Sequence, residues 1–195
     1  MTGDRAVIAT LLATLAGFIV YGLAVDSPFT WIYIIITVVL GVAVLLIHRA
    51  VRFPPRVLWG LTAAAAGNLA GGIWLVDGQP LYVYKVIGSM RFDKPFHFVA
   101  TGIAAWAALE VLRPRLRPAS TVGVAFVAVM MAAGAGALVE IVEYTGTLIL
   151  ENANVGDYGN NMADLVANLL GAMTAVTLAH LLAPATARVE RTGTG

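Results

Sequence analysis

Cysteine is absent from the 195-residue chain. Its absence excludes disulfide bonds, thiolate metal sites and a cysteine nucleophile, and it leaves the redox compartment undetermined. Charged residues are also scarce, at 12% against roughly 25% in typical soluble domains. Hydrophobic residues make up 59% of the chain, and the mean hydropathy is +0.85. This composition indicates an integral membrane protein.

Several familiar functional patterns are missing as well. Serine occurs only at positions 27, 89 and 120, and there is no GxSxG motif, which argues against an intramembrane serine hydrolase. Neither the GxGxxG pattern nor the P-loop pattern occurs, so the usual nucleotide-binding folds are excluded. The formal net charge is only +1, and such a balanced chain has no overall field to attract nucleic acid.

Long apolar runs dominate the chain instead. A helix needs about 20 residues to cross a bilayer, and six runs approach this length, at about 6–25, 29–47, 57–76, 96–112, 120–142 (or on to 150) and 162–183. The first run has no A-x-A-like cleavage site before Asp26, so we interpret it as an uncleaved span. We therefore predict an all-α, multi-pass bundle of six transmembrane helices in one domain over residues 1–184, followed by a disordered cytoplasmic tail over 185–195.

Basic residues predict the orientation of this bundle. With six spans both termini share one side, which would hold nine arginines: Arg5, Arg49, Arg52, Arg56, Arg113, Arg115, Arg117, Arg188 and Arg191. The other side would hold only Lys85, Arg91 and Lys94. By the positive-inside rule both termini are then cytoplasmic.

Glycine and alanine crowd the third, fifth and sixth predicted spans. Small residues at i, i+4 spacing allow helix backbones to approach closely, so we expect these three spans to form the packed core of the bundle. The connection over 77–95 is long, and its apolar and aromatic residues favour a segment lying in the membrane interface.

Polar side chains gather in the outward half of the last three predicted spans. Helical spacing places Glu140 and Glu143 on one face and Asn161, Asp164 and Asn168 on another. The full set comprises Asp93, His97, Glu140, Glu143, Asp157, Asn160, Asn161, Asp164 and Asn168, with Tyr144 beside the glutamates and Asn68 deeper in the third span.

One imidazole among carboxylates and carboxamides is a ligand set for a divalent cation such as Mg, Mn, Zn or Fe. The candidate metal ligands are His97, Glu140, Glu143, Asp157 and Asp164. The same groups equally suit a proton relay. There is no HExxH motif, and the second Glu-x-x-His of a di-iron bundle is missing, so spacing alone does not decide between the two.

Each of these residues also has a structural interpretation. Asn161 followed by Asp164 resembles a helix N-cap with an acid in the first turn. Asp93 resembles an ordinary helix start, and His97 an interfacial histidine bonded to a carbonyl. Glu140 is interfacial or deep depending on where its span ends, and a charge in lipid costs at least ~2.5 kcal/mol, so a deep carboxylate needs partners.

The same residues carry a family resemblance. The string RFDKPFHF over 91–98, the Glu140/Glu143 pair, the Gly-Asp dipeptide at 156–157 and the Asn161-to-Asp164 helix start resemble the YjdF-like family of small bacterial inner-membrane proteins. The resemblance covers about residues 91–172, and Asn161 stands where that family has aspartate. The pattern of Asp164, Asn168 and Gly171 is also similar, over a shorter stretch, to VanZ-like membrane proteins. Neither resemblance implies an established reaction.

Three hypotheses follow. The first is an outward-facing pocket between the last three helices that binds a divalent metal ion. If that pocket is catalytic, Glu140 or Glu143 is the general base of a hydrolase or transferase acting on a lipid or cell-envelope molecule at the outer membrane face. The second is a small proton- or cation-coupled transporter, although few polar residues continue toward the cytoplasmic side. The third is a structural or partner-binding subunit whose polar cluster locks the helices.

Overall fold

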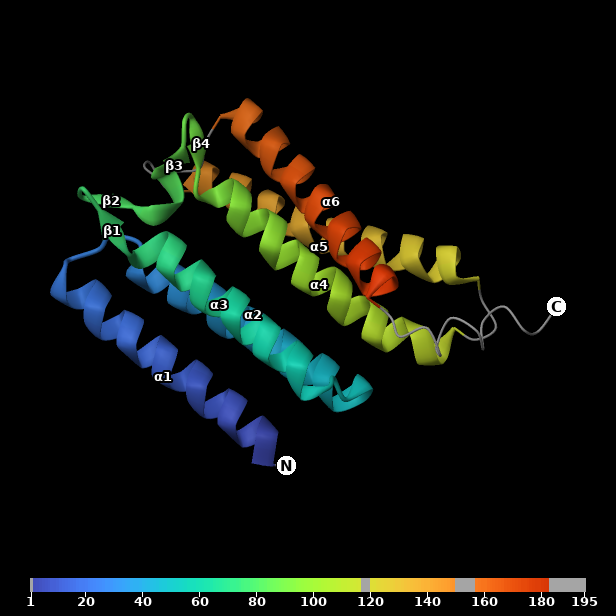
Figure 1. The fold of residues 1–195 in the computed structure, drawn as a ribbon. Coiled ribbons are helices and arrows are strands. Elements are labelled where there is room, and N and C mark those ends of the chain that lie inside the picture. Colours follow the sequence, from blue (N-terminus) through green and yellow to red (C-terminus); the bar gives the residue numbers. More distant parts are fainter. Residues whose placement is uncertain (1, 117–119, 150–156, 183–195) are drawn as a thin grey trace.

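Six α-helices make up most of the chain in a computed structural model, which describes residues 2–116, 120–149 and 157–182. The helices are α1 (Thr2–Ala24), α2 (Thr30–Val51), α3 (Pro55–Ile73), α4 (Asp93–Arg115), α5 (Thr121–Ile149) and α6 (Tyr158–Leu181). They run up and down the bundle, so α1 begins and α6 ends at the same end of the molecule (Figure 1). The fold is an all-α membrane bundle; the tail predicted over 185–195 lies outside the described residues.

Five of these helices, all except α3, are long and apolar enough to cross a membrane. α3 has 19 residues, which is about 28 Å of helix at 1.5 Å per residue, so its length is not what sets it apart. Its many glycines and alanines, together with Asn68, make it less apolar than α2, which precedes it. Length and composition therefore support five spans directly.

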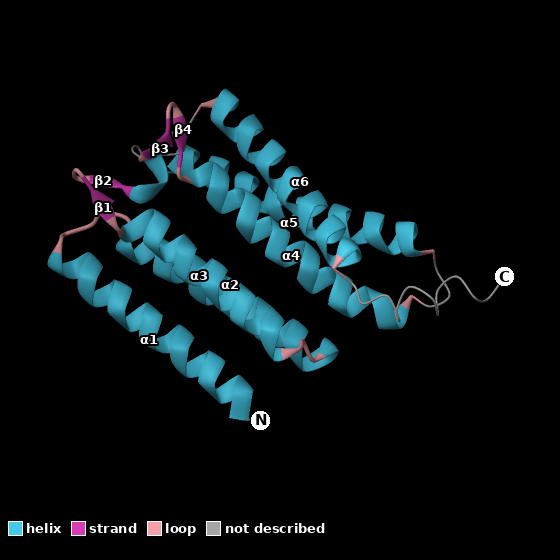
Figure 2. Ribbon diagram, viewed as in Figure 1, coloured by secondary structure: helices cyan, strands magenta, loops and turns pink. Residues whose placement is uncertain are grey.

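The connection between α3 and α4, which is predicted to lie in the membrane interface, contains short strands. β1 (Leu75–Val76) pairs with β2 (Gln79–Pro80), and after a 3-10 turn, η1 (Leu81–Val83), β3 (Lys85–Ile87) pairs with β4 (Met90–Arg91). Asp77 and Gly78 both have positive φ, as a tight two-residue hairpin turn requires. Both small sheets lie together at one end of the bundle (Figure 2).

α6 begins at Tyr158, and its N-cap is Asp157 rather than Asn161. The carboxylate of Asp157 accepts a hydrogen bond from the backbone N–H of Asn160 at 2.9 Å. Such a cap satisfies one of the free donors of the first helical turn. Asn160 and Asn161 therefore lie within the first turn of α6, and their side chains are not needed as the cap.

The packed core differs from the prediction that spans three, five and six form it. The most extensive helix contact joins α4 to α6, and α5 packs against both. A Cβ atom at Gly171 of α6 would clash with the carbonyl oxygen of Phe98 on α4, so only glycine permits this approach. The glycines of α3 serve another purpose, because Gly71 and Gly72 lie against the rings of Tyr82 and Tyr33.

Candidate functional site

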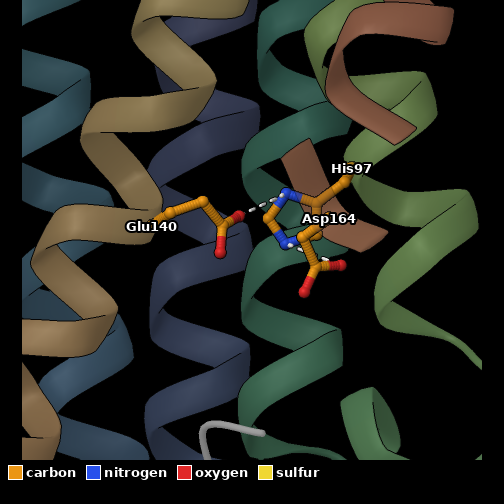
Figure 3. A group of neighbouring side chains, drawn as sticks. All are labelled: His97, Glu140 and Asp164. Carbon is orange, nitrogen blue, oxygen red and sulfur yellow. Dashed lines mark ion pairs between the residues drawn. The ribbon is translucent and has the colours of Figure 1, made fainter. Parts of the chain in front are cut away.

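Three acidic or basic side chains from three helices meet at the end of the bundle that carries the small sheets. His97 of α4, Glu140 of α5 and Asp164 of α6 offer ligand atoms that all lie within 4.8 Å of one another (Figure 3). Their exposed fractions are only 7%, 3% and 1%. The predicted convergence of the last three helices is therefore present at these residues.

His97 lies between the two carboxylates and presents a different ring nitrogen to each. Its Nδ1 is 3.4 Å from Oε1 of Glu140, and its Nε2 is 3.8 Å from Oδ1 of Asp164. The second separation exceeds hydrogen-bond range. The two nitrogens point in opposite directions from the ring, so one ion cannot bind both. An ion bound to Nδ1 would therefore lie near Glu140, and an ion bound to Nε2 would lie near Asp164.

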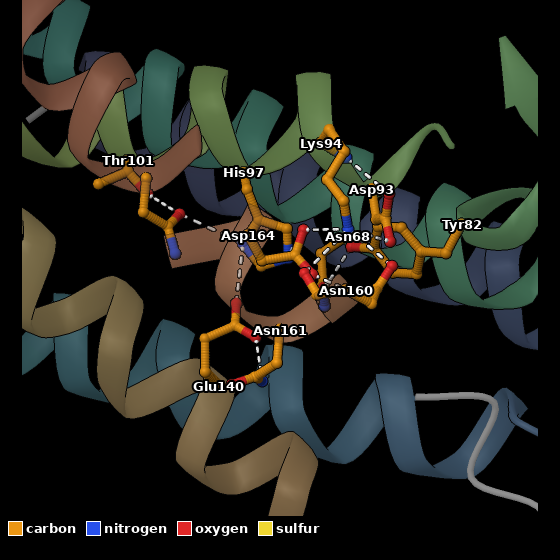
Figure 4. A network of polar contacts seen from close by, with 11 residues as sticks. Asn68, Tyr82, Asp93, Lys94, His97, Thr101, Glu140, Asn160, Asn161 and Asp164 are labelled. Atoms are coloured by element: carbon orange, nitrogen blue, oxygen red, sulfur yellow. Dashed lines mark hydrogen bonds and ion pairs between the residues drawn. The ribbon is translucent and has the colours of Figure 1, made fainter. Parts of the chain in front are cut away.

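The side chain of Lys94 enters the site from the first turn of α4. Its ammonium group lies 2.8 Å from Oδ1 of Asp164 and 3.0 Å from Oδ2 of Asp93. It also contacts two oxygens of Asn160, the side-chain Oδ1 at 2.8 Å and the backbone carbonyl at 3.3 Å. Asn160 in turn donates from Nδ2 to Oδ2 of Asp164 at 2.8 Å (Figure 4). Both carboxylate oxygens of Asp164 thus have donors.

Glu140 has a different environment. Asn161 donates from Nδ2 to its Oε2 at 2.8 Å. Oε1 of Glu140 is buried and has no hydrogen-bond partner among the described residues, although Nδ1 of His97 is 3.4 Å away. Leaving a buried carboxylate oxygen without a donor destabilises the fold by about 1–3 kcal/mol or more. A cation or a proton at this oxygen would remove that cost.

Asn168 forms the floor of the site. Its Oδ1 accepts from Thr101 at 2.5 Å and lies 3.2 Å from Nδ1 of His97. Its Nδ2 is buried without a partner in the described structure. A Cβ at Gly136 of α5 would lie only 2.7 Å from this amide, so the glycine creates the space that the asparagine fills.

A polar branch leads from the site toward the first three helices. Tyr82 donates to Oδ1 of Asn68 at 2.9 Å, and Asn68 donates from Nδ2 to Thr37 at 3.1 Å. Burial of the Tyr82 hydroxyl, reinforced by nearby negative charges such as Glu143, raises the pKa of this phenol well above its usual value of 10.0. Tyr82 is therefore a neutral hydrogen-bond donor that joins η1 to α3.

The charges of the site do not balance. Asp93, Glu140 and Asp164 are all buried, and Glu143 is half-buried beside them. Among the residues that the structure describes, the permanent cation bonded to this group is Lys94. Buried carboxylates require cations or protons as partners. The arrangement can therefore take up a further cation or hold protons.

Comparison of the sequence with known protein families gives one match. Residues 6–184 match the family described as "Predicted membrane protein (DUF2238)". The chain belongs to this family. No curated protein and no solved structure matches the chain. The family description establishes a membrane protein, in agreement with the apolar helices; it carries neither the YjdF-like nor the VanZ-like resemblance.

Some predicted residues of this family member lie away from the group. Asp157 is exposed at the N-terminus of α6, where it acts as the cap. Tyr144 is 61% exposed. Asn68 bonds to Tyr82 and Thr37, which places it in the polar branch and not among the acids.

Sequence reasoning missed three members of the network, Lys94, Thr101 and Tyr82. Lys94 is an orientation signal and part of the RFDKPFHF string in the sequence, but it is not among the residues predicted for the pocket. Thr101 is four residues after His97, so helical spacing places both on one face of α4. Tyr82 had no such signal, because its position depends on the hairpins that precede and follow it.

An apolar groove of about 360 Å³ lies elsewhere on the α4–α6 pair. It is lined by residues such as Ile103, Trp106 and Leu178 and by no acidic side chain. Trp106 donates from its ring nitrogen to Glu110 near the opposite end of the bundle. Both carboxylate oxygens of Glu110 also accept from Nη2 of Arg56. This groove and the His97 site are therefore separate features.

Proposed function

We propose that the pocket between α4, α5 and α6 binds one divalent metal ion on the Nδ1 side of His97. The single observation that carries the proposal is the buried, unpartnered Oε1 of Glu140, 3.4 Å from Nδ1. Two ligands that each lie about 2.1 Å from a tetrahedral ion are roughly 3.4 Å apart. The spacing of these atoms therefore suits a tetrahedral ion such as Zn, and the same imidazole and carboxylate donors also bind Mn, Fe or Mg.

The other groups fit supporting roles. The amide oxygen of Asn168 lies 3.2 Å from Nδ1 and is a further candidate ligand. Asp164 lies on the Nε2 side at 3.8 Å, the side on which metal-binding histidines commonly have a carboxylate, although this distance is beyond a direct hydrogen bond. In this proposal Asp164 places negative charge near the ring of His97, while Glu140 binds the ion. Glu143 contributes negative charge nearby.

We also propose that α3 spans the membrane, which gives six spans. α2 ends and α4 begins at opposite ends of the bundle (Figure 1). If α2 and α4 both cross, the helix that connects them has to cross as well. Both termini of the single domain over 1–184 are then on the arginine-rich, cytoplasmic side of a bacterial inner membrane, and the pocket opens outward to lipid or cell-envelope molecules.

Metal analysis of the detergent-purified protein tests the ion directly. We expect about one equivalent of a divalent metal per chain in the wild type, and loss of most of it in His97→Ala and Glu140→Gln. Matched controls come from the opposite end of the bundle. His48 stacks on Phe53 and Glu110 pairs with Arg56, so His48→Ala and Glu110→Gln should keep the metal. An absence of metal from the wild type after dialysis against each candidate ion would overturn the proposal.

A second candidate function, proton transfer, is favoured by a separate observation. The two nitrogens of His97 face carboxylates from two different helices, as in a relay that passes a proton through an imidazole. Proteoliposomes with an internal pH dye distinguish the two functions. A relay predicts proton flux that Glu140→Gln abolishes in metal-free buffer, whereas a metal site predicts no such flux.

A further inference from the structure

The ammonium group of Lys94 lies in a nearly complete oxygen cage. Four oxygens surround it: Oδ2 of Asp93 at 3.0 Å, Oδ1 of Asp164 at 2.8 Å, Oδ1 of Asn160 at 2.8 Å and the Asn160 carbonyl at 3.3 Å. An ammonium group has only three hydrogens. Four oxygens around three donors resemble a coordination shell more than a simple ion pair.

The chemistry of the cage is that of a cation site. Two of its oxygens are carboxylate and two are amide, the hard donors that alkali and alkaline-earth cations prefer. Potassium, rubidium and free ammonium ions are close in size to a lysine ammonium group. The cage is also well enclosed, because the side chains of Lys94 and Asp164 are 16% and 1% exposed.

We propose that this cage is a second cation site of the same pocket, filled permanently by the chain's own Lys94. The inference rests on the proposed function, because it sets the number of exchangeable ions. Lys94 bonds to both Asp93 and Asp164 and offsets one of their two negative charges. Glu140 is the buried carboxylate that has an unpartnered oxygen in the described structure, so it is the one left for an ion from solution. The pocket then binds one exchangeable divalent ion where a similar acid cluster without the lysine would bind two.

The cage also explains why Asp164 is a poor ligand for the exchangeable ion. Its Oδ1 contacts Lys94 and its Oδ2 accepts from Asn160. A divalent ion at Oδ1 would lie next to the ammonium group, and the two positive charges would repel each other. Lys94 is thus a positioning residue: it keeps Asp164 from binding the exchangeable ion and ties the start of α4 to the start of α6.

Chemical rescue of Lys94→Ala tests the proposal. The variant is purified in choline chloride, and its melting temperature is measured after exchange into ammonium, potassium, rubidium or lithium chloride at equal ionic strength. We expect a lower melting temperature in choline, recovery of most of the loss in ammonium, potassium and rubidium, and little recovery in lithium. We also expect about one retained rubidium per chain, against none in the wild type.

Control variants separate a cage from an ordinary salt bridge. Lys85 is an exposed lysine on β3, and Lys85→Ala should neither lose stability nor retain rubidium. Lys94→Met keeps the apolar stem and serves as a second test if Lys94→Ala does not fold in choline. If both Lys94 variants lack bound rubidium and gain no stability from any cation, or do not fold in any of these salts, Lys94 is only a structural ion pair and the proposal is wrong.

The outcome is independent of the divalent-metal experiment. If the wild type holds divalent metal but the Lys94 variants bind no rubidium, the cage proposal is wrong and the proposed function is still supported. If the wild type holds no divalent metal but Lys94→Ala retains rubidium, the proposed function is wrong and the cage proposal is supported. A rise from one to two divalent ions in Lys94→Ala would also support the cage, with a divalent occupant.

Discussion

The two halves of the bundle use small and polar residues in different ways. In the half formed by α4, α5 and α6, glycine brings two backbones together, and the polar side chains form a charged cluster. In the half formed by α1, α2 and α3, glycine makes room for aromatic rings, and the polar contact between Asn68 and Thr37 is neutral. The difference indicates that one half holds the buried charged cluster and the other packs aromatic side chains beside it.

The largest expected effect tests the backbone contact. Gly171→Ala would push a methyl group into the main chain of α4, which cannot move aside as a side chain can. We expect a loss of about 3 kcal/mol in stability, at the upper end of overpacking effects, measured as the melting temperature in detergent. Gly72→Ala should cost less because the obstacle is the side chain of Tyr33, which can shift where a main chain cannot. Gly134→Ala, which has open space around its Cβ, should cost nothing.

A buried asparagine in each half makes a second comparison. Asn168→Leu removes the amide that contacts Thr101 and His97, and the leucine has to fit against Gly136. We expect a loss of about 2 kcal/mol, measured by melting temperature, together with weaker metal retention. Unchanged metal content in this variant would show that Asn168 has no part in ion binding.

Asn68→Leu is the matching change in the other half. It removes the hydrogen bonds to Tyr82 and Thr37, so we expect a loss of about 1 kcal/mol. Metal content, measured by elemental analysis, should stay at the wild-type level. A loss of metal comparable to that of His97→Ala would contradict the division of roles between the halves.

The ion pair that joins the halves at the opposite end should matter less. Arg56 contacts Glu110 at 2.8 Å, but the side chain of Arg56 is 63% exposed. Exposed pairs contribute about 0.2–1 kcal/mol, so we expect Arg56→Gln to lower stability by no more than about 0.5 kcal/mol. The effect should shrink further in high salt, which a melting series in sodium chloride would measure.

The smallest expected effect concerns alkaline pH. Because the pKa of Tyr82 is raised above 10.0, the folded state keeps this phenol protonated while the unfolded state begins to ionise near pH 10. Stability from this group is therefore complete below pH 10 and falls as the pH rises further. Absorbance of tyrosinate should show one fewer late-titrating tyrosine in Tyr82→Phe than in the wild type.

The sequence predicted the helices and most of the cluster because their signals are periodic. His97, Glu140, Asp164 and Asn168 lie on helix faces. Counting residues along each helix was therefore enough to predict that they lie at a similar depth in the bundle. It could not show that Lys94 turns into the cluster, because a lysine at a helix start can equally point toward water. The role of the α3 glycines was also hidden, since their neighbours Tyr33 and Tyr82 come from other segments.

The contact at Gly171 has a consequence for access to the pocket. With main chain against main chain, α4 and α6 cannot slide past each other without a steric collision, so they behave as a single rigid body. α5 supplies Glu140 to this body, and its hydrogen bond to α6 at that point comes from Asn161. Any motion that admits or releases an ion should then be a tilt of α5 away from a fixed pair.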